Sequence, residues 1–306
     1  MRSTGVWGRL RFMTANPPRD AHVIRTATLT ALAMLAFAGN SLLCRAALAE
    51  AEIDPASFAT LRTLSGAIVL AVLLLLRPRR RADGPSGSWP AAIALAVYMA
   101  GFAYAYVSLD AGTGALILFG AVQITMMTAA FASGERLLRV QWVGFALAIA
   151  GLVWLMLPGV TKPSPMGAAL MAAAGAGWGV YSLRGRGVTD PLRATTANFV
   201  RATPIVAVVS VVALGSFEIS AKGAALAIAS GAVASGLGYT IWYAALRGLN
   251  GTRAAMVQLT VPVIAAVGGV LLLGETLTPR LVIAGLLTLG GVALAIGARA
   301  RAVRPG

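Results

Sequence analysis

Apolar runs of about 20 residues follow one another along almost the whole chain, and a run of that length can cross the ~30 Å hydrocarbon core of a bilayer as a helix. The pattern predicts ten such helices, near residues 26–48, 55–76, 90–109, 111–132, 140–158, 166–186, 192–214, 223–246, 252–273 and 279–298. The loops between them are short. We therefore expect an all-α polytopic membrane protein without an extramembrane domain.

The composition excludes a water-soluble fold. Of the 306 residues, 58 % are hydrophobic and only 11 % are charged, a balance that a soluble domain of this size does not tolerate. This excess of hydrophobic over charged residues is typical of transmembrane helices.

Basic residues divide the loops into two sets. Nineteen arginines lie in the N-terminal segment, in every second loop and in the C-terminal segment, whereas the other loops contain only Arg45, Lys162, Lys222 and Arg280. Because Lys and Arg in short loops stay cytoplasmic, this predicts both termini in the cytoplasm. The net charge of +15 is thus explained by the arginines that hold these loops on the cytoplasmic side of a lipid bilayer. The arginines form no aromatic-basic cluster, so no nucleic-acid partner is expected.

The two halves of the chain resemble each other weakly. Five pairs of features recur in the same order at offsets of 135 to 140 residues: Asp54-Pro55 and Asp190-Pro191, Arg62 and Arg201, Tyr106 and Tyr243, Val122–Thr125 and Val257–Thr260, and Gly134-Glu135 and Gly274-Glu275. Such a series of matches at nearly constant spacing predicts an internal repeat.

Each half contains five predicted helices, an odd number, so the second half enters the membrane from the opposite face. We expect a basic N-terminus over 1–25, a first five-helix repeat over 26–158, a second, inverted five-helix repeat over 159–298, and a C-terminal tail over 299–306. Inverted repeats are typical of secondary transporters that work by alternating access.

These features resemble the drug/metabolite transporter superfamily, EamA-type. The resemblance rests on ten spans in two halves, Arg62 in the second span, the two Gly-Glu pairs and the VQLTVPV stretch containing Pro262. Met126 and Met127 depart from it, since the family usually has a proline there. The resemblance implies a multi-pass protein of the bacterial cytoplasmic (inner) membrane that exports small metabolites, with the aromatic amino-acid exporters as the nearest likeness.

Aromatic side chains recur at four-residue spacing on the third and eighth predicted helices, which places each set on one helix face. The sets are Tyr98, Phe102 and Tyr106, and Ser235, Tyr239 and Tyr243 with Trp242 adjacent. We expect them to line a substrate cavity. The alternatives are a packing stripe or, for Tyr106 near a helix end, an interfacial belt.

Polar and aromatic residues on other helices are further candidates, because a bilayer disfavours them unless they face protein or water. Asn40 lies on the first predicted helix, Trp178 and Tyr181 on the sixth, and Gln123 and Gln258 at matched depth on the fourth and ninth. We expect these five to contact substrate. Helix packing and interhelical hydrogen bonds are the alternatives.

Arg62 and Arg201 are the only charges predicted well within helices. They are candidates for binding a substrate carboxylate or for gating, because the guanidinium fork suits a carboxylate. Stitching helix ends together is the alternative that we favour for both. Glu135 and Glu275 precede predicted helix starts, where a negative charge opposes the helix dipole favourably.

All ten acids are predicted in loops or at helix ends, and His22 precedes the first helix. Uniport or exchange is therefore as consistent with the sequence as proton antiport. We expect no cofactor, metal site or enzymatic activity, because zinc, Walker and Ser-His-Asp patterns are missing. We predict export of a small molecule, foremost amino acids with aromatic or bulky apolar side chains. Export of drugs, nucleosides or sugars, or an enzyme acting on lipid-linked substrates, are the alternatives; the oligomeric state is left open, a monomer being compatible.

Overall fold

The computed structural model describes residues 19–77, 87–132, 134, 138–157, 163–185, 188–246, 248–249 and 257–302. Within these ranges the chain is helical, and the single strand-like feature is an isolated bridge between Ile53 and Ile219. The helices are α1 Arg19–Ala49, α2 Pro55–Leu76, α3 Trp89–Tyr106, α4 Ala111–Ala132, α5 Arg139–Met156, α6 Pro165–Arg184, α7 Pro191–Val212, α8 Ala221–Ala229, α9 Gly238–Leu246, α11 Thr260–Leu273 and α12 Pro279–Ala302. A short 3₁₀ turn, Leu214–Ser216, follows α7.

Eight helices of the described chain are long and apolar enough to cross a membrane. Two shorter apolar helices follow, Thr260–Leu273 and Pro279–Ala295, where the ninth and tenth spans are predicted. The first part of the predicted ninth span lies outside the described residues. The protein is thus a multi-pass membrane protein, and most predicted boundaries agree with the observed helices to within a few residues.

Side chains set several of the helix starts. Asp54 accepts a hydrogen bond from the Ser57 backbone N–H at 2.9 Å at the start of α2, and Asp190 does the same for Arg193 at 3.2 Å in α7. In both helices the next residue is proline, whose missing N–H costs nothing in the first turn. The repeated Asp-Pro pair is therefore a helix-capping signal.

The predicted eighth span is helical throughout but not uniform. A π-helical segment, Ser230–Leu237, joins α8 to α9 and packs between α1 and α2. Its sequence SGAVASGL contains small residues, and Gly231 sits directly against the Arg62 backbone carbonyl. Small side chains let helix backbones approach closely, and π-helical turns are frequent at functional sites.

Contacts between helix ends fix the direction in which successive helices run. At one end of the bundle, the segments after α1 and α7 are joined by a hydrogen bond from Asp54 N–H to Glu218 C=O at 2.8 Å. At the other end, Arg77 after α2 pairs with Asp190 before α7 at 2.9 Å. Helices α1 and α7 therefore run in the same direction, and α2 runs in the opposite one.

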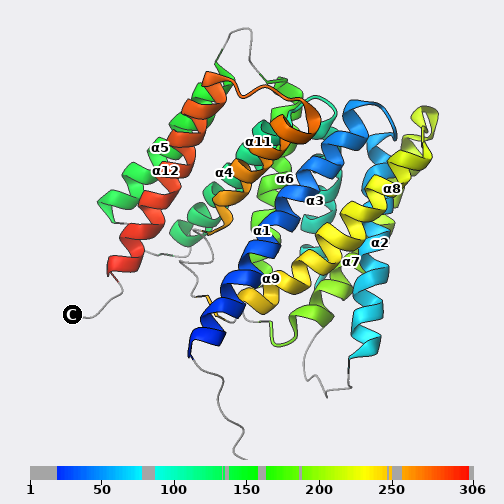
Figure 1. The fold of residues 1–306 in the computed structure, drawn as a ribbon, viewed down its shortest axis with the longest axis horizontal. Helices are drawn as coiled ribbons and strands as arrows, with labels where there is room; N and C mark the ends of the chain where they lie inside the picture. Colours follow the sequence, from blue (N-terminus) through cyan, green and yellow to red (C-terminus); the bar gives the residue numbers. More distant parts are fainter. Residues whose placement is uncertain are drawn as a thin grey trace, which may run out of the picture.

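Figure 1 shows α5 and α12 side by side at one edge of the bundle, with α2, α7 and α8 at the opposite edge. The α5–α12 pair is close because Gly144 and Gly291 face each other, so that a side chain on either would meet the other's carbonyl oxygen. Helices α1, α3, α4, α6, α9 and α11 lie between these edges.

Candidate functional site

A narrow central cavity lies among helices from both halves of the chain. It is lined by Phe37, Asn40, Ser41, Tyr98, Phe102, Leu118, Phe119, Trp178, Ala234 and Tyr239. Its volume is about 20 Å³, little more than the ~10–15 Å³ that one water molecule needs. The bundle must widen before a metabolite can occupy this position.

Aromatic rings form most of the cavity wall, with Trp178 at their centre. Its ring centroid lies 4.9 Å from that of Tyr98, 5.0 Å from Tyr239 and 6.5 Å from Phe37. Tyr98 also packs edge-on against Phe102 at 5.4 Å. Such tilted and edge-to-face contacts stabilise aromatic clusters, and their apolar faces could receive a flat or bulky apolar side chain.

Polar side chains connect three helices beside this wall. The Asn40 amide donates to the Tyr98 hydroxyl at 3.3 Å, and its carbonyl oxygen accepts from the Ser230 hydroxyl at 2.5 Å. Ser230 is fully buried at the start of the π-helical segment. The network links α1, α3 and the π-helical segment at the cavity.

Arg62 lies next to the same wall and is fully buried, with 0 % of its surface exposed. It donates to the Tyr98 hydroxyl at 2.8 Å and to the Ser235 hydroxyl at 3.3 Å. Its guanidinium carbon lies 5.0 Å from the Tyr98 ring centre and 4.7 Å from that of Phe102, within the range of cation–π attraction. These are neutral partners for a permanent positive charge.

Five of the predicted substrate contacts thus come together at the cavity: Asn40, Tyr98, Phe102, Trp178 and Tyr239. The others lie outside its lining. Trp242 is buried against Phe37 at 5.9 Å, Tyr181 stacks on the far side of Trp178 at 5.5 Å, and Gln123 is buried further along α4. Gln258 is half-buried before α11, and the side chain of Tyr243 is outside the described part of the structure.

The two predicted intramembrane arginines have different surroundings. Arg201, on α7, lies 5.9 Å from the Trp89 ring centre, near the start of α3, and it does not line the cavity.

Tyr106 does not lie in an interfacial belt, which was one of the two alternatives for it. It is fully buried and donates to the Ala111 carbonyl at 3.2 Å, so the interfacial-belt interpretation is wrong for this residue.

Sequence reasoning missed Phe37 and Ser230. Phe37, Asn40 and Ser41 are spaced three and four residues apart on α1, which would have placed all three on one face. Ser230 carried no such signal, because the π-helical turn changes which residues of this segment face α1.

A second pocket opens at the end of the bundle where α3 and α7 begin. Its volume is about 200 Å³, and Ser88, Tyr181, Arg184, Thr195 and Asn198 are among its lining residues. Tyr181 belongs to this pocket and Trp178 to the central cavity, and their rings are in contact. The Trp178–Tyr181 pair therefore stands between the two spaces.

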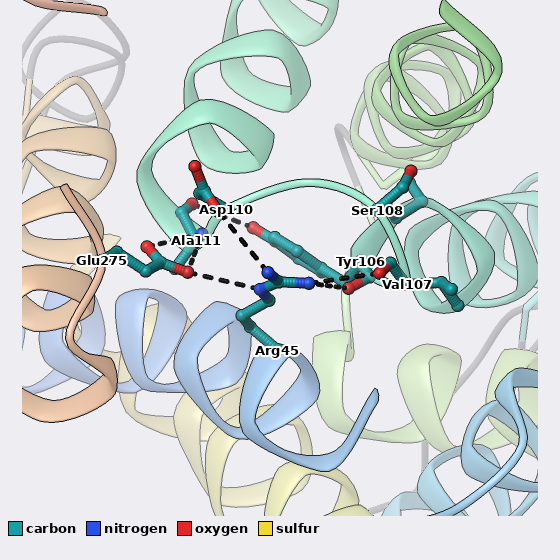
Figure 2. Close-up of polar contacts among 8 residues, drawn as sticks. Arg45, Tyr106, Val107, Ser108, Asp110, Ala111 and Glu275 are labelled. Carbon is teal, nitrogen blue, oxygen red and sulfur yellow. Dashed lines mark hydrogen bonds and ion pairs between the residues drawn. The ribbon is translucent and has the colours of Figure 1, made fainter. Parts of the chain in front are cut away.

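The opposite end is closed by a charged group that we call the Arg45 cluster, formed by Arg45, Asp110 and Glu275 with the backbone of Tyr106 and Ala111 (Figure 2). Arg45 pairs with Glu275 at 3.4 Å and with Asp110 at 3.5 Å, and it donates to the Tyr106 carbonyl at 3.0 Å. One side chain of α1 thereby binds the end of α3, the start of α4 and the segment before α12.

Local backbone structure positions Glu275. Gly274 has φ +66°, a left-handed conformation that side chains disfavour, and it turns the chain so that Glu275 N–H binds the Gly269 carbonyl at 3.1 Å. The Glu275 carboxylate then lies against Gly269, where any side chain would collide with it. Its two oxygens, Oε1 and Oε2, both accept a hydrogen bond from the Ala111 N–H, at 2.9 and 3.0 Å.

This arrangement corrects the expected role of Glu275. The carboxylate binds the start of α4, where the helix dipole attracts it, while Thr278 caps the following α12 by accepting from Leu281 N–H at 3.2 Å. Burial raises the pKa of the Glu275 carboxyl, because the lost solvation outweighs the Ala111 hydrogen bond and the attraction of Arg45. Glu135, its repeat partner, lies outside the described residues.

In the described part of the chain, no group of three His, Cys, Asp or Glu side chains could hold a metal ion.

Comparison with known proteins decides the family. The profile of the EamA-like transporter family matches this chain twice, over residues 24–157 and 165–297. The chain belongs to the EamA-like transporter family. A Pseudomonas aeruginosa relative, "Uncharacterized protein PA1977", is 54 % identical over 283 residues, which cover 92 % of this chain and 98 % of that protein.

More distant relatives of this EamA-like protein bear transporter names. The "Uncharacterized transporter YwfM" of Bacillus subtilis is 26 % identical, covering 76 % of this chain and 81 % of its own. The "Probable terminal-alkyne amino-acid exporter" of Streptantibioticus cattleyicolor is 27 % identical, covering 81 % of this chain and 86 % of its own. A solved structure titled "Crystal structure of protein" matches the fold with a TM-score of 0.62 at 20 % identity, covering 88 % of this chain and 98 % of that one.

Proposed function

We propose that this EamA-like transporter is a secondary exporter of amino acids with aromatic or bulky apolar side chains, and that it is not an enzyme. The observation that carries the proposal is the aromatic cavity around Trp178, enclosed by helices of both halves. The name of the Streptantibioticus relative, an amino-acid exporter at 27 % identity, supports the same class. We propose that transport requires no cofactor.

The cavity suits such a substrate in two ways. The faces of Trp178, Tyr98 and Tyr239 would pack against an apolar side chain once the helices separate, because aromatic rings bury large area with little loss of conformational freedom. Asn40 and the neighbouring hydroxyls offer both donors and acceptors to the polar end of the compound. A carrier of uniformly apolar compounds would not need this polar side.

Alternating access by two inverted repeats, 26–158 and 159–298, is the proposed mechanism. It is supported by the two separate family matches and by the helix directions, which make α1 and α6 antiparallel. In this account the Arg45 cluster closes one end, and the pocket at Tyr181 lies at the other. Exchange of conformations between the repeats would open the first end and close the second.

The same account places the protein in the bacterial cytoplasmic membrane with both termini in the cytoplasm. The arginine distribution in the sequence supports this orientation, and of the described arginines, Arg77 and Arg184 lie at the end with the Tyr181 pocket. The Arg45 cluster would then face the exterior. The structure would represent a carrier closed to the outside, with a narrow pocket leading towards the cytoplasm.

Counterflow into proteoliposomes tests the proposal. Vesicles loaded with an unlabelled amino acid are diluted into the same labelled compound, and a panel of aromatic, branched and charged amino acids is compared. The proposal predicts accumulation of aromatic and branched members over protein-free vesicles. Accumulation of no member, or of the charged members alone, would overturn the substrate assignment.

A further inference from the structure

Arg62 is a buried charge without a charged partner. It is the largest of the fully buried side chains in the described chain, and no acid pairs with it among those residues. Guanidinium stays protonated in proteins, so the positive charge persists at this depth. A charge inside a transmembrane bundle is costly, and residues of this kind commonly mark substrate or ion pathways.

The bonds that Arg62 does make use only part of the guanidinium. Nε donates to Ser235 and Nη2 to Tyr98, whereas the buried Nη1 has no hydrogen-bond partner in the described part of the chain. A residue that only held helices together would be expected to use all its donors in doing so, since an unsatisfied buried donor destabilises the fold. Nη1 is therefore a donor held ready for something else.

A second unpartnered donor lies in the same site. The Tyr239 hydroxyl is buried and makes no hydrogen bond to any described residue, and its ring lines the central cavity. Tyr239 follows Ser235, which binds Arg62, by one helical turn. Arg62 itself packs against Tyr98 and Phe102, two other lining residues. Tyr239 therefore lines the cavity, and the charged Arg62 lies directly behind two of its other lining residues.

A carboxylate fits this pair of donors. It has two oxygens, each able to accept more than one hydrogen bond, and it would neutralise the guanidinium. We propose that Arg62 binds the carboxylate of the transported compound through Nη1, with the Tyr239 hydroxyl as second donor, so that this site selects carboxylic acids over their amides and amines. The inference rests on the proposed function and gives its cavity a specific recognition element.

The rejection of neutral analogues follows from the same geometry. A primary amide brings two donors of its own and no charge, so it leaves the Arg62 charge uncompensated in a desolvated site. Sites built to bind a charged or polar group discriminate strongly against compounds that lack it. Arg201, the repeat partner of Arg62, lies by Trp89 near the start of α3 and provides a matched control.

Thermal unfolding of the purified protein tests the anion site without transport. Phenylacetate and the neutral phenylacetamide are titrated against the wild type, Arg62→Gln, Tyr239→Phe and Arg201→Gln. Phenylacetate alone should raise the unfolding midpoint of the wild type and of Arg201→Gln. Tyr239→Phe, which loses only the hydroxyl, should need at least about tenfold more phenylacetate for the same rise. Arg62→Gln should show no rise.

Equal stabilisation by the acid and the amide would overturn the proposal, as would an unaltered response of Tyr239→Phe. The latter variant keeps the test decisive where Arg62→Gln does not fold.

A transport arm separates this inference from the proposed function. Counterflow of labelled L-phenylalanine is challenged with unlabelled L-phenylalanine, L-phenylalaninamide and phenethylamine. Competition by the acid at concentrations at least about tenfold below those of the other two supports the Arg62 site. Equal competition by all three compounds would agree with the proposed transport function but would overturn the carboxylate site at Arg62. If phenylacetate alone raises the unfolding midpoint but no amino acid is transported, the carboxylate site is supported and the amino-acid assignment is overturned.

Discussion

Arg45 and Glu275 are 230 residues apart in the sequence and form an ion pair at 3.4 Å. Their side chains are only 19 % and 9 % exposed, so the pair is shielded from solvent more than most surface pairs. Figure 2 shows that the same Arg45 reaches Asp110 and the Tyr106 carbonyl. The first half of the chain is thereby tied to the second at one end of the bundle.

Removing Glu275 should loosen that end. Glu275→Ala leaves the Arg45 Nε and the Ala111 N–H without the acceptor that they share, a loss on the order of 2 kcal/mol. Spin labels on cysteines replacing Ser108 and Leu277, in a protein whose only native cysteine, Cys44, is replaced by Ala, should show a longer and broader distance distribution.

Glu52→Ala is the matched control, because Glu52 pairs with Lys222 at the same end but is not part of the Arg45 cluster. It should leave that distribution unchanged. An unchanged distribution in Glu275→Ala would show that the Arg45 cluster does not hold this end closed.

Acidification should favour the packed form of the cluster. The pKa of Glu275 is raised above its ordinary value of 4.5 by burial, so the packed end binds a proton more tightly than an opened end with a solvated carboxyl. The stabilisation by this proton is complete below 4.5 and is lost as the pH rises through the raised pKa. The label distances should therefore narrow on going from about pH 8 to about pH 5.

Glu275→Gln cannot ionise and should remove this pH dependence. Widening of the wild-type distances on acidification would contradict the sign of the coupling.

Gly231 should be far less tolerant of substitution than Gly285. A side chain at Gly231 would collide with the Arg62 carbonyl and the Ser65 hydroxyl, whereas a methyl group at Gly285 would have no packing neighbour within 4 Å in the described part of the structure. Gly231→Ala should separate the π-helical segment from α2 and lower the unfolding midpoint clearly. Gly285→Ala should leave it unchanged or raise it, since alanine favours helix by about 1 kcal/mol. Similar midpoints in both variants would contradict this packing.

The helices could be predicted from the sequence because their signals are local. Runs of apolar residues and the Asp-Pro pairs at positions 54 and 190 mark spans and starts without reference to any other part of the chain. The π-helical segment was not predicted. Its residues are compatible with an α-helix, and its close packing on Arg62 is a tertiary effect.

Only part of the site could be predicted. Four-residue spacing placed Tyr98 and Phe102 on one helix face, and both lie in the lining of the cavity together with Tyr239. Repeat matching was less reliable. Arg62 and Arg201 occupy equivalent places in the two halves, yet only Arg62 adjoins the cavity. The inward position of the Glu275 carboxylate was likewise hidden, since the sequence shows it in a loop.

Trp178 provides the most direct test of the central claim that amino acids pass through the aromatic cavity. The measurement is counterflow of labelled L-phenylalanine into proteoliposomes containing the wild type, Trp178→Ala or Trp154→Ala. Trp154 is 40 % exposed on α5 and does not line the cavity, so it controls for the loss of an indole ring. The account predicts transport by the wild type and by Trp154→Ala, and at least about a tenfold loss in Trp178→Ala, consistent with removal of a central aromatic contact. Undiminished transport by Trp178→Ala would contradict it.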